Sequence, residues 1–356
     1  MGDTAIAPMY ETLAKRGVRV EFFQQVTNLG VDRARKLVDR IDIVRQARLL
    51  GEYDPLCSVE IQSQEHSKRM GQLRCWPSVP KWDKLVNGSS LRDSGIDFER
   101  GEAEPNAERR SLHLGADFDT VVLAISPAAL APICAEVMEV SPAVARMLEN
   151  THTIMTQAFQ ISMNTDPKDL GFDHGHAAMS TFVEPLDTGA DNSQVLWTEN
   201  WPDGLSPKAV WYFCGVLDDA DGDTTDEVID RAKRNALDYL AHIGDQWPGA
   251  VGLDGFRWEI LVDPENDVGE ARFDRQYWRA NSTATERYVQ SLPGTVKHRL
   301  AVDESGIDNL FLAGDWTKNG FNLGAVEATV MSGMQASRAI SGHPERIPWE
   351  SYPWMT

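Results

Sequence analysis

The segment that most constrains the fold of this chain is residues 309–328, which read NLFLAGDWTKNGFNLGAVEA. A short apolar strand ends there in Gly314 and Asp315, a loop of glycine and asparagine follows, and a helix begins near Gly324. Residues 325–340 are rich in alanine, serine and glycine, so this helix can approach a sheet or a flat ligand closely. The Asp315 carboxylate can hold hydroxyl groups, and the N–H groups at a helix start favour negative charge. The pattern predicts a strand–turn–helix unit for a ligand with hydroxyls and an electron-rich oxygen.

This segment resembles the closing FAD-binding motif of the flavin amine oxidase and phytoene desaturase superfamily. The resemblance implies that Gly314 and Asp315 lie along the ribityl-pyrophosphate. It also implies that the backbone N–H groups of Ala325 and Val326 face the flavin oxygen and stabilise negative charge on the reduced ring. The alternative interpretation is a tight β–α turn that only packs.

Four further residues are candidates for cofactor contact under this resemblance. Trp316 could shield the flavin or line the substrate cavity, although most tryptophans pack in cores. Asn322 could hydrogen-bond the cofactor or only its own turn, since asparagine tolerates positive φ. Gly324 stands at the helix start. Val26 matches the family position whose backbone pairs with the adenine edge, and a plain strand valine is the alternative.

The opening motif of these flavoproteins is absent. They begin with a strand, Gly-x-Gly-x-x-Gly, a helix and an acidic residue about twenty positions later. No such pattern follows a strand anywhere in the 356 residues. Residues 1–23 instead resemble an internal family segment, in which a helix precedes the strand with the adenine-contacting valine. The resemblance therefore implies the C-terminal half of a FAD-dependent oxidoreductase, entered in the middle of a longer, truncated protein.

The expected fold class is α/β plus α+β. It combines an incomplete FAD-binding Rossmann-like domain with a mixed-sheet substrate domain. Residues 1–50, 115–140 and 300–342 are the expected remnant of the FAD-binding domain, 51–114 a loop-rich insertion, 141–299 the substrate domain, and 343–356 a C-terminal tail.

Hydrophobic periodicity and capping residues place the elements within these domains. The first helix should run from residue 3 or 4 to residue 16, with Gly17 ending it. The run at 119–126 is apolar throughout, which is typical of a strand buried on both faces. The expected strands cover residues 18–29, 38–49, 119–126, 154–163, 177–183, 209–216 and 256–262, and the longest helix covers residues 225–243.

Charge and cysteine usage limit the partners. A net charge of −20 disfavours nucleic acid and anionic membrane surfaces. The four cysteines are widely spaced, so no disulfide framework or zinc site is expected, and a reducing cytoplasm is the simplest setting. No apolar run approaches the ~20 residues that span a bilayer. His174 and His176 alternate, but nothing nearby supplies further ligands, so no metal is expected.

The resemblance implies hydride transfer to flavin from a small organic or lipophilic substrate, either an amine or an isoprenoid-like molecule. In the family that the chain resembles, some members attach flavin to a cysteine shortly before the closing motif. No cysteine follows Cys214 here, so the resemblance implies that FAD is held non-covalently. The sequence assigns no catalytic acid or base. Two alternatives stay open. The chain could be a non-catalytic subunit that completes a split flavoenzyme with a partner chain carrying the Gly-x-Gly-x-x-Gly half, or an inactive truncated fragment.

Overall fold

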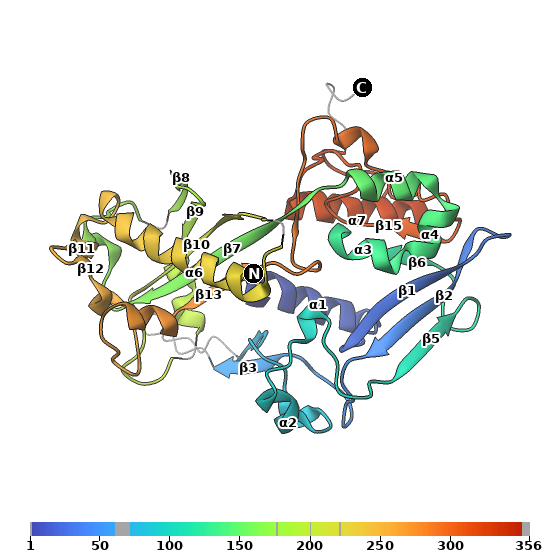
Figure 1. Cartoon of the computed structure of the whole chain (residues 1–356). Helices are drawn as coiled ribbons and strands as arrows, with labels where there is room; N and C mark the ends of the chain where they lie inside the picture. Colours follow the sequence, from blue (N-terminus) through green and yellow to red (C-terminus); the bar gives the residue numbers. More distant parts are fainter. Residues whose placement is uncertain (1, 61–71, 176, 200, 221, 351–356) are drawn as a thin grey trace. The chain divides into compact units, whose positions relative to one another are not determined.

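The structure is a computed structural model (Figure 1), which describes residues 2–60, 72–175, 177–199, 201–220 and 222–350. The chain separates into two compact units, each assembled from three stretches of sequence. Both contain helices and strands, so the protein is mixed α/β with several sheets. Residues 61–71 of the expected insertion and 351–356 of the expected tail lie outside the described residues. Unit 1 comprises Met1–Arg19, Asp54–Pro80 and Met155–Ser282, and unit 2 comprises Val20–Tyr53, Lys81–Ile154 and Thr283–Thr356.

Unit 1 is organised around a sheet with the strand order β13-β7-β10-β9-β8, in which each neighbouring pair is antiparallel. The strands expected at 154–163, 177–183 and 209–216 are confirmed, and so is the long helix α6. The bounds are Thr153–Met163 for β7, Ala178–Val183 for β8, Leu186–Asp191 for β9, Ala209–Leu217 for β10, Tyr277–Asn281 for β13 and Thr225–His242 for α6.

The smaller elements of unit 1 lie at its N-terminus and in two hairpins. The expected first helix is confirmed as a π-helical turn, Gly2–Ile6, that continues into α1. Gly17 follows it with a φ of 82°. The bounds are Ala7–Lys15 for α1, Cys57–Glu60 for β3, Gln72–Cys75 for β4, Val251–Gly252 for β11 and Gly255–Phe256 for β12.

One face of the large sheet packs against α6 and forms the core of unit 1. Alternate residues of β7 and β10 point to this face, where the rings of Phe159 and Phe213 stack with centroids 4.8 Å apart. Tyr239 of α6 packs edge-on against Phe159 at 5.8 Å. The opposite face carries Gln160 and Tyr212, which are register partners. The sheet therefore has one apolar face and one face with polar groups.

The prediction of a strand at 256–262 is wrong. Its segment Trp258–Ile260 forms a 3₁₀ turn, and the backbone N–H of Leu261 donates to the carbonyl of Trp258 at 3.0 Å. Phe256 is buried, as the apolar pattern predicts. The side chains reach the core from successive tight turns, so a strand-like alternation arises without a strand.

Sequence patterns do not predict β9, because its residues LDTGAD have low strand propensity. The strand forms because β10 offers it an edge, with Gly189 opposite Phe213. A Cβ added to Gly189 would lie 2.9 Å from the Phe213 ring. The missing side chain therefore lets β9 close over a core aromatic, which is a tertiary effect.

Unit 2 contains an antiparallel sheet in the order β1-β2-β5 and a parallel pair, β6 and β15. The strands expected at 18–29 and 38–49 are confirmed as β1 and β2, which pair with each other, but β1 begins only at Gln24. Phe23 has a φ of 57°, which interrupts the extended chain. β5 lies within the expected insertion, yet it completes this sheet. The bounds are Gln24–Asp32 for β1, Leu37–Arg45 for β2, Arg109–His113 for β5, Val121–Leu123 for β6, Tyr288–Val289 for β14 and Leu310–Leu312 for β15.

Helices surround these strands. α3 and α4 pack against β1 (Figure 1), and Pro127 begins α3 as expected. No helix in the described part of the chain is both long and apolar enough to cross a membrane. The bounds are Gly88–Asp93 for α2, Pro127–Ile133 for α3, Ala135–Val140 for α4, Pro142–Asn150 for α5 and Val326–Ser341 for α7.

The parallel pair is short and covered mainly on one side. Val121 and Leu123 are buried, but Val122 between them is 46% exposed. The prediction that the strand at 119–126 is buried on both faces is therefore wrong for β6 in this chain. Phe311 is the register partner of Val122 and is only half-buried. Parallel sheets are normally covered on both faces, so this pair presents an incompletely covered face.

The start of α6 offers a test of local capping. The Thr224 hydroxyl accepts a hydrogen bond from the Glu227 N–H at 3.3 Å, and the Glu227 carboxylate accepts one from the Thr224 N–H at 2.9 Å. Thr224→Ala should lower the free energy of unfolding by ~1 kcal/mol, measured by urea denaturation. Thr225→Ala, one residue into the helix, is the matched control. Equal effects of the two substitutions would contradict the capping role.

Candidate functional site

A pocket of about 250 Å³ lies at the carboxyl ends of β6 and β15 in unit 2. This is the edge at which open α/β sheets bind ligands. Three of the predicted cofactor residues line it, namely Gly314, Asp315 and Trp316. The other lining residues are Ala124, Ile125, Ser126, Pro127, Thr285, Arg287, Tyr288, Val289 and Thr329.

The turn after β15 requires glycine at its first position. Gly314 has a φ of 143°, and an added Cβ would stand 2.3 Å from Nε1 of Trp316. The Trp316 side chain is 2% exposed and packs in the core cluster of unit 2. Trp316 therefore anchors the turn to the core of unit 2. Its predicted contact with a flavin stays a prediction.

Two hydroxyl groups join this turn to α7. The backbone N–H of Gly314 donates to the Ser332 hydroxyl at 2.9 Å. The Thr317 hydroxyl donates to the Gly314 carbonyl at 2.9 Å and lies 2.8 Å from the Ser332 hydroxyl. Both side chains are completely buried. From sequence, Ser332 was only one of several small residues in this helix. The available signal for its role as a hydrogen-bond acceptor was a serine on an otherwise apolar helix face.

Asp315 is half-buried beside a buried cation. Burial raises the pKa of its carboxyl, and the positive charge of Arg299 opposes that rise. The Arg299 guanidinium donates to the backbone carbonyl of Asp315 and, at 2.8 Å, to the Ser291 hydroxyl. Within the described part of the chain, no other residue donates a hydrogen bond to the Asp315 carboxylate. The carboxylate can therefore accept hydrogen bonds from ligand hydroxyls.

The loop that follows is held by its own asparagines. The Asn319 side-chain oxygen accepts the N–H groups of Phe321 and Asn322, each at 2.9 Å. The Asn322 side-chain oxygen accepts the Asn319 N–H at 3.1 Å, and Asn322 has a φ of 51°. Asn322 thus performs the turn role given as its alternative, and its predicted cofactor contact stays untested.

Gly324 allows a close approach at the end of the loop. A Cβ there would lie 2.4 Å from the Tyr288 ring, and the Tyr288 hydroxyl donates to the Gly324 carbonyl. α7 then begins at Val326, with Ala325 extended at φ −160° and no side-chain cap. Since the first N–H groups of a helix have no partner inside it, the start of α7 favours a negatively charged or electron-rich atom.

Val26 does not line the pocket. Its side chain packs against the same core cluster as Trp316. It lies on β1, the edge strand of the antiparallel sheet, where it is the register partner of Ile43. Alternate backbone groups of an edge strand lack a strand partner, so a contact through the backbone of this strand is physically feasible.

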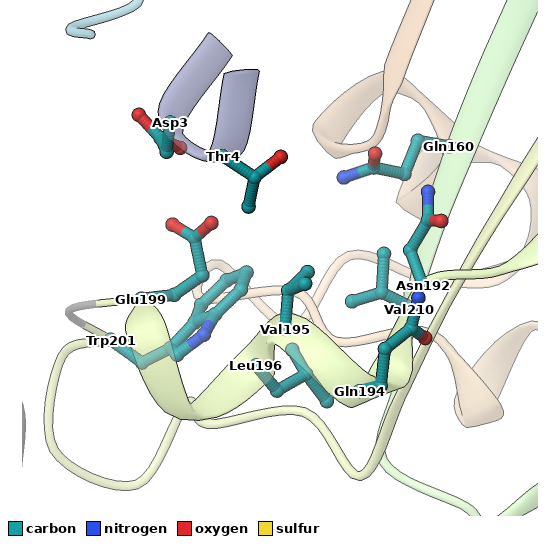
Figure 2. Close-up of a pocket in the computed structure, with 10 residues that line it drawn as sticks. All are labelled: Asp3, Thr4, Gln160, Asn192, Gln194, Val195, Leu196, Glu199, Trp201 and Val210. Carbon is teal, nitrogen blue, oxygen red and sulfur yellow. The ribbon is translucent and has the colours of Figure 1, made fainter. Parts of the chain in front are cut away.

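A second pocket, of about 420 Å³, lies in unit 1 (Figure 2). It contains two carboxylates and three side-chain amides, and none of the described residues that line it is a lysine, arginine or histidine. Burial and the negative charge of Asp3 raise the pKa of Glu199. The pocket is therefore acidic. Its lining residues are Asp3, Thr4, Gln160, Asn192, Gln194, Val195, Leu196, Glu199, Trp201 and Val210.

Among the described residues, no group of three or more histidine, cysteine, aspartate or glutamate side chains is placed to hold a metal ion. Of the histidine pair considered above, His176 lies outside the described residues.

Most of the chain is similar to known proteins. Residues 104–341 match the family described as flavin containing amine oxidoreductase. An oxidoreductase from Methanosarcina mazei is similar in structure, with 11% identity and a TM-score of 0.49, over 93% of this chain and 52% of that one. A triple mutant of putrescine oxidase, made to redesign cofactor binding, has 14% sequence identity and a TM-score of 0.36. The match covers 66% of this chain and 46% of that one. The chain spans about half the length of these structures. No curated protein matches the sequence.

The hydroxyl pair that joins the turn to α7 can be tested by substitution. Ser332→Ala removes the acceptor of the Gly314 N–H and should lower the free energy of unfolding by ~1–3 kcal/mol, because a buried donor loses its partner. Urea denaturation measures the change, and amide hydrogen exchange at Gly314 should become faster. Ser337→Ala, on the exposed side of the same helix, is the control. Unchanged exchange at Gly314 would contradict the assignment.

Proposed function

The chain belongs to the family of flavin-containing amine oxidoreductases, and we propose that it forms the C-terminal part of a FAD-dependent oxidoreductase that oxidises an amine. The pocket at the ends of β6 and β15 carries this proposal. There the Asp315 carboxylate is half-buried and has no donor from another described residue, and Thr329 of the first turn of α7 lines the same pocket.

The residues of this pocket fit one end of a FAD molecule. The Asp315 carboxylate is a hydrogen-bond acceptor for the ribityl hydroxyls. At the start of α7, outside the residues that line the pocket, the N–H groups of Ala325 and Val326 would be donors for an oxygen of the flavin ring. Gly314 and Gly324 let the turn and the loop pack closely against Trp316 and Tyr288, which shapes this end of the site. Bound FAD would supply the acceptor for the substrate hydride. The protein would hold it without a covalent bond, since no cysteine follows Cys214.

The acidic pocket of unit 1 supports an amine rather than an isoprenoid-like substrate. An isoprenoid needs an apolar lining, whereas this pocket presents Asp3, Glu199 and the amides of Gln160 and Asn192 (Figure 2). A protonated amine supplies a positive charge and hydrogen-bond donors that complement these carboxylates and amide oxygens.

A dinucleotide-binding segment is the second part of the proposal. The pyrophosphate of FAD normally binds at a helix start that follows Gly-x-Gly-x-x-Gly, and the 356 residues contain no such motif after a strand. The exposed side chain of Val122 leaves one face of the short parallel pair uncovered, which supports a further segment packed over that face. We infer that a segment with this motif, in a partner chain or elsewhere in a longer protein, completes the site. An inactive fragment is the alternative.

Asp315→Ala tests the cofactor site in the chain combined with a segment that carries the glycine motif. Loss of a charge-assisted hydrogen bond of ~1.5–3 kcal/mol should weaken FAD binding by about tenfold or more. Asp308→Ala, which removes an exposed carboxylate two residues before β15, should leave binding unchanged. Flavin absorbance after extensive dialysis and FAD titration measure the effect, with circular dichroism as the check on folding. Full flavin occupancy in Asp315→Ala would contradict the assignment.

The same titration separates the completed enzyme from an inactive fragment. The 356-residue chain alone should bind FAD several powers of ten more weakly than the combination. Sub-micromolar binding by the chain alone would show that no further segment is needed. If the segment fails to restore binding, the inactive fragment is favoured.

The acidic pocket can be tested with n-butylamine, which is protonated at neutral pH. Calorimetry should show binding that strengthens as the pH rises through the raised pKa of Glu199, because the carboxylate must be ionised to attract the ammonium group. Glu199→Gln and Asp3→Asn should each weaken binding by about tenfold. Asp254→Asn, in an exposed turn of unit 1, is the control. Equal binding of n-butanol would contradict the proposal.

A further inference from the structure

Two cysteines oppose each other across the hairpin of β3 and β4. Cys57 and Cys75 are direct register partners in this antiparallel pair. The Cys57 thiol donates a hydrogen bond to the Cys75 carbonyl at 3.5 Å. Both are free thiols, as are Cys134 and Cys214. The pair is separated by seventeen residues in sequence, so only the strand register reveals it.

The register brings the two cysteines close to the separation that a disulfide requires. Opposed residues of an antiparallel pair have Cα atoms about 4.5 or 5.5 Å apart, and disulfides occur at about 4.4–6.8 Å. Their Cβ atoms lie about 4.5–5.5 Å apart, at or beyond the upper end of the disulfide range of about 3.5–4.5 Å. The bond therefore closes after a small inward movement of the strands. A bond with such strain is easily reduced again.

The two thiols differ in their surroundings. Cys57 is half-buried and so is the one that a small oxidant reaches. Cys75 is buried, and burial, followed by the charges of Asp3, Cys57 and Glu199, raises its pKa to about 11. Because of this difference, Cys57 is the thiol that reacts first with the oxidant, and Cys75 is the thiol that then reacts with Cys57.

We propose that Cys57 and Cys75 are a reversible redox modification site for which hydrogen peroxide is the oxidant. The Cys57 thiolate attacks one peroxide oxygen, the O–O bond breaks, and Cys57 becomes a sulfenic acid while the other oxygen leaves as water. The Cys75 sulfur then attacks the Cys57 sulfur, the S–O bond breaks, and a second water leaves. Two thiols and one peroxide thus give one disulfide and two waters, and an external dithiol reverses the reaction.

The disulfide would act on the acidic pocket of unit 1. Cys75 precedes Trp76, whose backbone N–H donates to the Asp3 carboxylate at 2.8 Å. Asp3 lines that pocket. A bond between Cys57 and Cys75 fixes the strand end that holds Asp3, so the oxidation state of the pair restricts the position of one carboxylate of the pocket. The proposal does not depend on the binding of a flavin.

The test treats the whole chain with stoichiometric hydrogen peroxide and maps disulfides by mass spectrometry of peptides. We expect a single link between the peptides of Cys57 and Cys75, loss of two free thiols, and recovery of both after dithiothreitol. Cys214→Ser, outside the pair, should form the same link. No link, or a link between other cysteines, would overturn the proposal, and this measurement needs no variant of the pair.

Two variants test the order of reaction. Cys75→Ser should stop at a Cys57 sulfenic acid, which dimedone captures. Cys57→Ser should leave Cys75 as a thiol that dimedone does not label, because Cys75 is buried and protonated. Capture at Cys75 instead of Cys57 would overturn the assigned roles.

Discussion

The hydrogen bonds around the Ser332 hydroxyl hold the candidate cofactor pocket in shape. Ser332 accepts the Gly314 N–H and contacts the Thr317 hydroxyl, so hydrogen bonds connect the turn after β15 to α7. Asp315 lies between the two residues of the turn, Gly314 and Thr317, that contact Ser332, so these hydrogen bonds constrain the backbone on both sides of it. Since the groups are buried, water cannot replace a lost partner.

Both pockets carry an electrostatic cost that binding can relieve. Asp315 is partly withdrawn from water without a donor from another described residue, and the pKa of its carboxyl is raised. The pKa of the Glu199 carboxyl is also raised, by desolvation and by the negative charge of the nearby Asp3, although the residue as a whole is exposed. Perturbed carboxylates in a cavity are typical of functional sites, although structural networks also produce them. Here the hydroxyls of one ligand and the ammonium group of another would supply the missing donors.

The long helix α6 and the β15–α7 junction were predictable, because both depend on local signals. A capping threonine and apolar periodicity define α6, and Gly314 permits a backbone that other residues rarely adopt. The segment at 256–262 shows the limit of prediction from apolar patterns, because its apolar residues are buried by tight turns and form no strand. In the site, the role of Asp315 as a carboxylate at a strand end followed from sequence, whereas its neighbour Arg299, sixteen residues earlier, did not.

The sequence by itself determined the family, the strand–turn–helix unit near the C-terminus and the glycines that unit requires, because backbone conformation and periodicity are encoded within a few neighbouring residues. Only the tertiary structure decided which distant side chains meet. It placed Ser332 on the Gly314 turn, Asp3 near Glu199 and Cys57 opposite Cys75. Strand register and helix packing fix such contacts, and they follow from the burial of the whole chain rather than from any short segment.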